Sequence, residues 1–405
     1  MRNLLLKKKV GQKERRRILQ STILIAPSLV FLLLAFLLPI GTFFYYSVAN
    51  QEIPATLPNT VRALAQWDGE GVPGEPAFDA MVTDIRAADR RDVAILARRL
   101  NYQHAGNRTL ILKTARSLAK PTTADTAAQA LSHIDSRWSQ PDIWLTLKRE
   151  SGSVTSFYLL SALDLEIDPE GSLRQTPEAR AIYGDVLART FWMSLVITLT
   201  CLVLGYPVAF LLSTVRKGLR NWLLLFVLLP FWTSLLVRTL AWMVLFQKNG
   251  IVNDLLVFLQ LTAQPIQLIN TRMAVYVGMI HILLPFMILP LYSVMVGISP
   301  SYYKAAVSLG AHPFRAFWTV YVPQTLPGIG AGMLLVSILA LGFYITPELL
   351  GAPADQMVSY FVAFYTNQSV NWGMAAALGV WLLMFALILF ALLNRFVGFN
   401  RMRLR

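Results

Sequence analysis

The sequence has few of the residue types from which most catalytic and metal centres are built. It contains one cysteine, Cys201, so no disulfide can form within the chain. Its four histidines lie far apart, without the spacing of metal ligands. The dipeptide Gly-Lys, which a phosphate-binding P-loop requires, is absent, as are a nucleophile elbow and a kinase signature. These absences exclude ATP hydrolysis by a P-loop and argue against an enzyme.

Charge is also scarce. Charged side chains make up 14% of the 405 residues and hydrophobic ones 55%, whereas a soluble domain has about 25% charged residues. A helix needs about 20 apolar residues to cross about 30 Å of hydrocarbon. Continuous runs of Leu, Val, Ile and Phe favour helices over the alternating strands of a barrel. We therefore predict an all-α polytopic membrane protein with six transmembrane helices, at 23–46, 191–215, 222–246, 273–298, 328–345 and 373–393.

The basic residues predict how this bundle is oriented. Residues 47–189 carry 16 basic and 18 acidic side chains. Positive segments stay inside, so we expect both tails, 1–22 and 396–405, in the cytoplasm of a bacterial inner membrane and residues 47–188 outside it. The net charge of +14 follows from this asymmetry and needs no nucleic acid. Seventeen Lys or Arg and one acid lie in four further segments: 1–22, 216–220, 299–327 and the residues after Leu393.

The first apolar run, 23–46, has the basic start of a signal peptide and is followed by Ser47-Val48-Ala49, which resembles a cleavage site. The hydrophobic region of a signal peptide spans about 7–15 residues, and this run is longer. We therefore interpret it as a retained transmembrane anchor.

Residues 47–188 are numerous enough to form a domain of their own. Apolar side chains recur there at helical spacing in three stretches, which predicts a mainly α-helical domain. We expect extended chain at 57–58 and 69–76, and a strand at 157–160 after a serine-rich loop. The three stretches are Phe78, Met81, Val82 and Ile85; Val93, Leu96 and Leu100; and Ala124, Ala127, Ala128, Leu131, Ile134 and Trp138.

The 299–327 loop contains a short helix with defined ends. Ser299 is a suitable N-cap, a proline follows at the first helical position, and Gly310 ends the helix. A second helix begins at Pro313, and we expect Pro323 to bend the chain into the fifth span.

This short helix has a surface that another protein would fit. Ala305 and Ala306 allow close approach, and apolar side chains are exposed around them. The helix either packs on its own bundle at the membrane surface or is covered by a partner. Its other apolar residues are Tyr302, Tyr303, Val307 and Leu309.

The same loop resembles the EAA loop of ABC-importer permeases, whose pattern is E-A-A, three residues, G, nine residues, I-x-L-P. Lys304 stands where that motif has glutamate, and valines replace its isoleucine and leucine. In that family the helix docks in a groove of a cytoplasmic ATPase, which the resemblance implies for residues 300–310. The residues implied to couple to the ATPase are Lys304, Ala305, Ala306, Gly310 and Pro323.

Four further stretches resemble the spermidine/putrescine-type permeases: LLPFWTSLLVRTLAWMVLF, HILLPFMILPLYSVM, LGFYITPELLG and NWGMAAAL. The resemblance covers residues 185–395. It implies a type I importer fold with a permease core at 189–395, and a polyamine as the transported solute.

Polar and aromatic residues in the spans are candidates for the transport pathway. Arg238 lies within the third span, where it meets substrate, snorkels to the membrane surface, or neutralises a neighbouring carboxylate as a structural pin. Glu348 either meets a cation or is solvated at a helix end. Aromatic side chains stack on an ammonium or form an interfacial belt. The candidate pathway residues are Trp232, Arg238, Trp242, Tyr344, Glu348 and Asp355.

Small residues four positions apart, Gly328 with Gly332 and Gly373 with Ala377, are typical of helices that pack closely. We interpret both pairs as packing sites.

We therefore interpret the chain as a non-enzymatic permease subunit that forms half of a pathway and works by alternating access. One docking loop implies a second permease subunit, two ATPase subunits that use ATP and Mg, and an extracytoplasmic substrate-binding protein. The chain itself is expected to bind no cofactor and no metal, and to contact membrane lipid.

Three alternatives stay open. In the first, the transported solute is an organic anion or an amino-acid derivative instead of a polyamine. A secondary transporter driven by ions would need acids at membrane depth, which the six spans lack except at their margins. A receptor that senses ligand through residues 51–187 would need a cytoplasmic signalling domain, which the sequence does not contain.

Overall fold

The computed structural model describes residues 22–120, 125–168 and 171–397. The chain divides into two compact units, Met1–Tyr158 with Ile167–Ser172, and Leu159–Glu166 with Leu173–Arg405. We call residues 47–158 the inserted domain and residues 173–397 the helical core. The last residue of the first unit, Ser172, lies 16 residues before the boundary at 188 that the sequence indicated.

The described residues form an all-α polytopic membrane protein, as predicted. Five helices are long and apolar enough to span a membrane, and a bent helix pair makes a sixth. The first helix includes a π-helical segment, η1 (Leu33–Leu37), followed by α2 (Leu38–Tyr45). The five are Thr22–Tyr45, Tyr183–Thr214, Arg272–Met295, Pro313–Gly342 and Trp372–Arg395.

The inserted domain is mainly helical, as its apolar stripes predict. Trp138 and Trp144 are fully buried at its centre, with ring centroids 5.3 Å apart. Each indole N–H has a partner, because Trp138 donates to Thr114 Oγ1 and Trp144 to the Trp138 carbonyl. The elements are α3 (Glu52–Thr56), α4 (Pro58–Ala65), α5 (Glu75–Ala87), α6 (Arg90–Gln103), α7 (Asn107–Leu118), α8 (Ala127–Ile134), η2 (Ser136–Ser139), α9 (Pro141–Arg149) and α10 (Phe157–Ser161).

Two local predictions for this region are wrong. Residues 57–58 are not extended chain but the junction of α3 and α4, where buried Asp84 accepts hydrogen bonds from the Asn59 and Thr60 amides at the N-terminus of α4. Residues 157–160 belong to helix α10 and not to a strand. The described strands are β1 (Leu165–Ile167) and β2 (Leu173–Gln175), which pair with each other.

The two ends of the inserted domain are joined by short antiparallel pairing. The Asn50 amide donates to the Ser153 carbonyl, and the Thr155 amide donates to the Val48 carbonyl. The Asn50 side chain also donates to the Glu150 and Gly152 carbonyls. Because its entry and exit are held together, the domain is a closed loop insertion.

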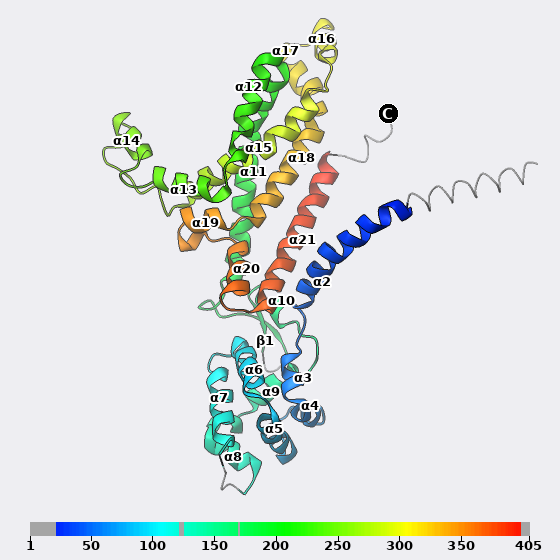
Figure 1. Ribbon diagram of the computed structural model, residues 1–405, viewed down its shortest axis with the longest axis vertical. Helices are drawn as coiled ribbons and strands as arrows, with labels where there is room; N and C mark the ends of the chain where they lie inside the picture. The colour runs from blue at the N-terminus through cyan, green and yellow to red at the C-terminus, as the bar shows by residue number, and fades with distance from the viewer. Residues whose placement is uncertain (1–21, 121–124, 169–170, 398–405) are drawn as a thin grey trace, which may run out of the picture. The chain divides into compact units, whose positions relative to one another are not determined.

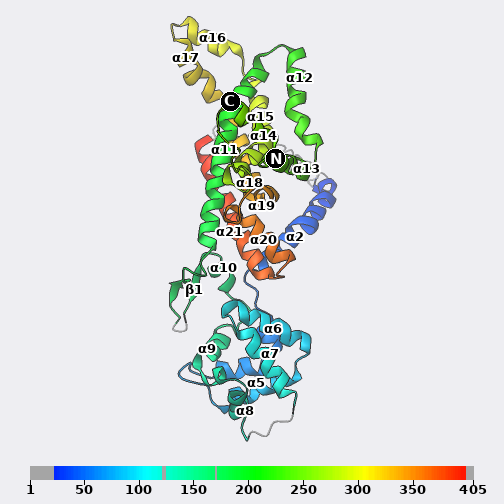
Figure 2. The ribbon, with the colours of Figure 1, turned by 90° about the vertical axis from the view of Figure 1, so that its left-hand side faces the viewer.

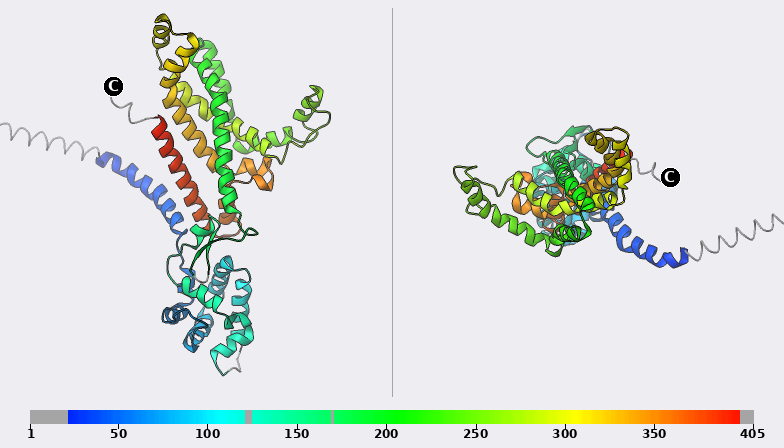
Figure 3. Two further views of the ribbon diagram at one scale, coloured as in Figure 1. Left: turned by 180° about the vertical axis from the view of Figure 1, so that it is seen from behind. Right: turned by 90° about the horizontal axis from the view of Figure 1, so that it is seen from above.

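The helical core is built on three long helices that contact one another, α11 (Tyr183–Thr214), α15 (Arg272–Met295) and α18 (Val322–Gly342). Figures 1 and 3 show them side by side, with α21 (Trp372–Val397) against α18. A Cβ at Gly332 would lie 2.7 Å from Met287 Sδ, and one at Gly328 would lie 3.1 Å from the Pro290 carbonyl. These glycines let α18 approach α15 closely, as the small-residue spacing predicts.

The third span is broken, whereas the sequence indicated one straight helix at 222–246. Helix α12 (Lys217–Leu228) continues as the 3-10 segment η3 (Leu229–Trp232), then α13 (Leu235–Leu245) leaves at an angle of 95°. Pro230 removes a backbone donor, and Ser234 caps the new helix by accepting from the Val237 amide. Helices α13 and α14 (Ile251–Phe258) project sideways from the three long helices (Figures 1 and 3).

The fifth span is longer than predicted. Helix α17 (Pro313–Ala316), the π-helical segment η4 (Phe317–Tyr321) and α18 form one helical run from 313 to 342. Pro323 lies inside this run, just after the π-helical segment, and the helix continues past it, so the chain is not broken there as expected. The remaining elements of the core are α16 (Pro300–Ser308), α19 (Ile345–Leu350), η5 (Pro353–Asp355) and α20 (Val358–Asn367).

Candidate functional site

Helix α16 has the ends that the sequence predicts. Ser299 caps it by accepting from the Ser301 amide. Gly310 has φ +92°, and the Gly310 and Ala311 amides donate to the Val307 and Ala306 carbonyls. This is a Schellman ending, which a residue with a side chain adopts only with strain. The helix is therefore fixed in length at both ends.

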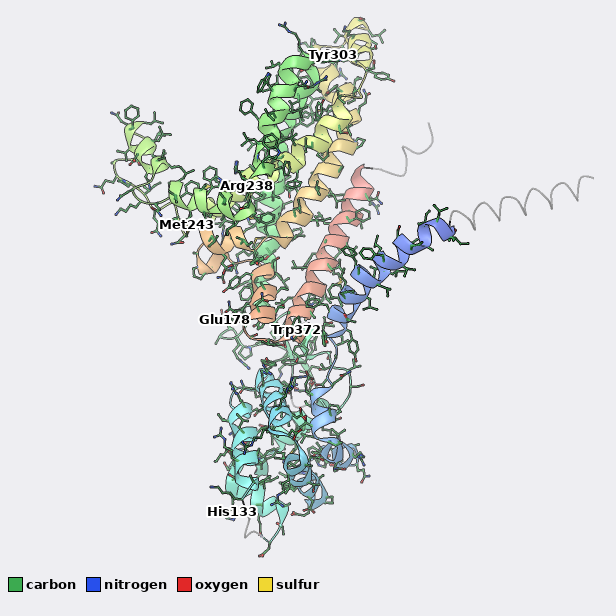
Figure 4. The ribbon with its side chains drawn as sticks, in the orientation of Figure 1. His133, Glu178, Arg238, Met243, Tyr303 and Trp372 are labelled. Atoms are coloured by element: carbon green, nitrogen blue, oxygen red, sulfur yellow. The ribbon has the colours of Figure 1, made fainter. Side chains whose placement is uncertain are left out.

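Helix α16 and the turn after it expose a concentrated apolar surface, which we call the coupling surface: Tyr302, Leu309, Phe314 and Trp318. Leu309 is 89% exposed, and the other three side chains are also exposed. Lys304 and Ala305 are exposed beside them, and Ala306 is half-buried. Figures 2 and 4 show α16, with Tyr303, at the end of the helical core opposite to Trp372.

Arg238 lies one turn into α13, on the same face as Trp242 four residues later. Its Nε and Nη1 atoms are buried, and neither has a hydrogen-bond partner among the described residues. The Trp242 indole N–H donates to His281 Nδ1 of α15 at 3.1 Å. An indole and an imidazole therefore meet beside the face of α13 that carries Arg238, and no described acid pairs with this arginine.

The predicted carboxylates lie elsewhere. Asp355 is buried and accepts from Arg272 Nε at 2.7 Å, so this pair joins η5 to the start of α15. Arg189 donates to the Ala354 and Gln356 carbonyls on either side of it. Glu348, on α19, is exposed and forms no ion pair within the described ranges. Asp355 is thus engaged inside the core, whereas Glu348 is exposed.

The six predicted pathway residues do not form one site. Trp232 is 73% exposed on η3, and Tyr344 is exposed just before α19. A cavity of about 340 Å³ between α11, α12 and α15 is lined by His281 but by none of the six. Only Arg238 and Trp242 come together, and α19 approaches them through a hydrogen bond between Thr239 and Thr346. The remaining lining of that cavity is apolar and includes Leu212, Leu223, Val227, Pro230 and Ile288.

Residues 187–400 match the family described as binding-protein-dependent transport system inner membrane component. This match covers more than half of the chain and the whole helical core except its first residues. The chain belongs to this family. It is a permease subunit of an ABC importer, a transport component of the inner membrane, as the EAA-loop spacing predicted.

Individual relatives match about half of this permease. It is 39% identical over 222 residues to the spermidine/putrescine transport system permease protein PotB of Haemophilus influenzae, covering 53% of this chain and 77% of that protein. It is 34% identical over 199 residues to PotB of Escherichia coli, covering 49% of this chain and 72% of that protein. A crystal structure of a bacterial ABC transporter that imports the acidic polysaccharide alginate aligns with 55% of this chain and 80% of that chain, at 19% identity and a TM-score of 0.44.

Three features of the permease were not found from the sequence. His281 has no second metal ligand near it in the sequence, which gave no reason to consider it. In the structure its Nδ1 accepts a hydrogen bond from Trp242, 39 residues earlier in the chain. The Arg272–Asp355 pair spans 83 residues. The break before α13 had a local signal, since Pro230 followed by Ser234 is a helix stop followed by an N-cap.

Proposed function

We propose that this permease imports a polyamine of the spermidine or putrescine kind. The observation that carries the proposal is the 39% identity to a spermidine/putrescine permease over 77% of that protein's length. The family match at 187–400 falls on the helical core, which contains the coupling surface, Glu348 and all the candidate spans except Thr22–Tyr45. The inserted domain adds residues beyond this shared part, and the solute specificity is assigned to the core.

Helix α16 is proposed to transmit ATP-driven motion by docking in a groove of a cytoplasmic ATPase. Exposed Leu309 and Phe314 support this role, because a loop at the end of a bundle exposes such side chains only where a partner buries them. Ala305 allows close approach. Lys304 differs from the acid of the motif, so docking rests on the apolar contacts and not on that charge.

The working importer is proposed to contain this chain, a different second permease, two ATPase subunits and an extracytoplasmic substrate-binding protein. One coupling helix per chain and two ATPases require two permeases. The ATPases hydrolyse ATP with Mg, since this sequence lacks the Gly-Lys of a P-loop. The chain itself holds no cofactor. Co-purification of the gently solubilised, tagged chain should recover these four kinds of partner, and recovery of the permease alone would contradict this assembly.

Both termini and the coupling surface are proposed to face the cytoplasm, with the inserted domain outside. Basic segments at the tails and at 299–327 support this orientation. Ser136 and Ser299 are both exposed, so each can be replaced by cysteine in a Cys201→Ala background. An impermeant thiol reagent should label only Ser136→Cys in intact cells and both variants in lysed cells. Equal labelling of the two variants in intact cells would contradict the proposed orientation.

The substrate is tested with the complete importer in proteoliposomes. Spermidine or putrescine with the binding protein should stimulate ATP hydrolysis and accumulate inside, and Glu348→Gln should lower uptake with little change in assembly. Glu178→Gln, which removes another acid of the same unit, is the matched control. An importer that ignores polyamines would contradict the proposed substrate.

A small organic anion is the second candidate, favoured by one observation: the buried Arg238 atoms have no acidic partner in the described part of the chain. If an anionic solute stimulates ATP hydrolysis and polyamines do not, Arg238 becomes the substrate contact.

A further inference from the structure

The cation Arg238 is half-buried, with its Nε and Nη1 atoms fully covered, in a part of the molecule that contains almost no acids. Beyond Arg189 the sequence has only three, Asp254, Glu348 and Asp355. Asp355 already holds Arg272, and no described carboxylate lies within ion-pair distance of Arg238. The structural-pin interpretation, in which Arg238 neutralises a neighbouring carboxylate of its own chain, therefore does not hold in this structure.

The surroundings of Arg238 do not replace that missing acid. Its position one turn into α13 is near the positive end of the helix dipole, which disfavours a cation. His281 is the titratable group of α15 that its charge reaches, and an imidazole is neutral or positive. Trp242 gives its indole N–H to His281 and not to the guanidinium. Two buried guanidinium nitrogens without an anion are costly, which favours an anion supplied by another molecule.

A polyamine substrate also needs an acid in this part of the molecule. It carries two or more ammonium groups and needs carboxylates along a desolvated route. In the described spans α11, α15 and α21, the charged residues Asp185, Arg189, Arg272 and Arg395 stand near the helix ends. Of the three acids beyond Arg189, Asp254 and Glu348 are exposed and buried Asp355 is paired with Arg272, so the described core supplies no unpaired buried carboxylate for such a substrate.

We propose that one carboxylate of the second permease subunit answers both needs: it pairs with Arg238 while the pathway is empty, and the polyamine displaces Arg238 from it. This inference rests on the proposed polyamine import. Arg238 then competes with the polyamine for this carboxylate and lowers the affinity of the transport pathway for the polyamine. The break before α13 contributes, because it turns Arg238 away from the line of α12 and presents it at the side of the three long helices (Figure 4).

The test compares Arg238→Gln, Arg238→Lys and the control Lys248→Gln in the complete importer. Lys248 is an exposed cation three residues beyond α13. Removing the competitor should lower the apparent KM for spermidine by about 3- to 10-fold and raise ATP hydrolysis without substrate, because a tenfold change needs only about 1.4 kcal/mol. Arg238→Lys should retain the wild-type KM within about twofold, and Lys248→Gln should change nothing.

The carboxylate that pairs with Arg238 can be identified by mutating the second permease. Each acid in its spans is replaced by the corresponding amide, once in the wild-type background and once together with Arg238→Gln. One substitution should lower assembly or uptake at least tenfold alone and be relieved by Arg238→Gln, since the pair is then removed together. If Arg238→Gln alone fails to assemble, the same double variant should restore assembly. Additive effects for every acid would overturn the proposal.

Other outcomes separate the alternatives. If Glu348→Gln is the substitution relieved by Arg238→Gln, the pair forms within this chain and the proposal is wrong. An effect of Arg238→Gln that vanishes in vesicles without anionic lipid would assign Arg238 to a lipid phosphate instead. Failure of the wild-type importer to take up spermidine overturns the proposed function, whereas uptake with an unchanged KM in Arg238→Gln overturns only this inference.

Discussion

The inserted domain and the helical core each contain an arginine whose Nε and Nη1 atoms are buried without a hydrogen-bond partner, but only the arginine of the inserted domain has a described acid beside it. In the inserted domain Arg99, 2% exposed, donates to Glu150 Oε2 at 2.8 Å, and its guanidinium carbon lies 5.0 Å from the Phe157 and Tyr158 ring centroids. In the core Arg238 is half-buried, and no described carboxylate lies within ion-pair distance of it. Since a buried charge without an anion is costly, Arg99 is stabilised within its own domain, whereas no described acid of the core stabilises Arg238.

Aromatic side chains differ between the two regions in the same sense. Trp138 and Trp144 are fully buried in the inserted domain, as in a soluble protein. Trp222, Trp232 and Trp318 are exposed in the core, where lipid or another subunit covers such surface. Changes in the core should therefore affect transport before stability, and changes in the inserted domain should do the reverse.

The largest expected effect comes from the coupling surface. Gly310→Val forces a β-branched residue to φ +92°, and Ala305→Trp fills the space for close approach. Each should lower uptake more than tenfold while ATP hydrolysis continues and membrane abundance is unchanged. Both rates are measured in proteoliposomes, with Gly218→Ala as the control because no atom lies within 4 Å of a Cβ there. If both variants transport at the wild-type rate with coupled ATP hydrolysis, α16 is not the helix that docks on the ATPase.

The next effect should fall on the stability of the inserted domain alone. Glu150→Ala leaves Arg99 buried without its anion, which costs about 3–5 kcal/mol. Hydrogen exchange on the whole chain should show lost protection in α6 and α9 and none lost in α15 and α18. The double variant Arg99→Met with Glu150→Ala should recover part of the protection, and exposed Asp79→Asn is the control. Equal loss in both regions would erase the contrast between them.

The sequence predicted what depends on neighbouring residues. Span number, fold class, the caps of α16 and the stripes of α5 and α6 follow from apolar length, helical spacing, and the Ser299 and Gly310 positions. The strand predicted at 157–160 failed because an aromatic run favours a strand locally, while Arg99, nearly 60 residues away, packs on the rings of Phe157 and Tyr158 where α10 begins. Contacts of that range are not encoded in local spacing.

The candidate pathway could be predicted only in part for the same reason. Arg238 was recognisable as a cation in an apolar run. Its lack of a partner and its neighbour His281 depend on the break before α13 and on α15, 43 residues further along the chain. Asp355 read as a substrate carboxylate because Arg272 is distant in sequence. Whether Glu348 contacts a solute remains a prediction.

A smaller effect should come from close packing inside the core. Gly332→Ala would place a Cβ 2.7 Å from Met287 Sδ and 3.2 Å from the Met287 carbonyl, and such overpacking costs about 1–3 kcal/mol. The thermal stability of the detergent-solubilised chain should fall, and adding Met287→Ala should restore part of it by removing the sulfur. Gly342→Ala, with open space at its Cβ, should not destabilise. Unchanged stability in Gly332→Ala would mean that α18 and α15 are not in close contact.

The smallest effect should be a pH-dependent one in the inserted domain. The Arg137 guanidinium donates to Asp135 at 2.9 Å, and this hydrogen bond lowers the pKa of Asp135 from 3.8 to about 2. A carboxylate with a depressed pKa stabilises the fold above its unfolded pKa, and this contribution is lost as the pH falls from about 4 to 2.

Asp135→Asn keeps an oxygen to cap η2 and removes only the charge. By linkage the charge contributes at most about 2.5 kcal/mol, and about 1 kcal/mol once solvent screening of this partly exposed pair is allowed for. Hydrogen exchange of α7 and η2, corrected for intrinsic rates, should show this loss at pH 7 and a smaller difference from wild type at pH 3. Asp79→Asn should show neither. If the difference in protection between Asp135→Asn and wild type is the same at pH 7 and pH 3, the Asp135 charge does not stabilise the domain. The ion pair of Arg99 with Glu150 would then be the one that contributes to the stability of the domain.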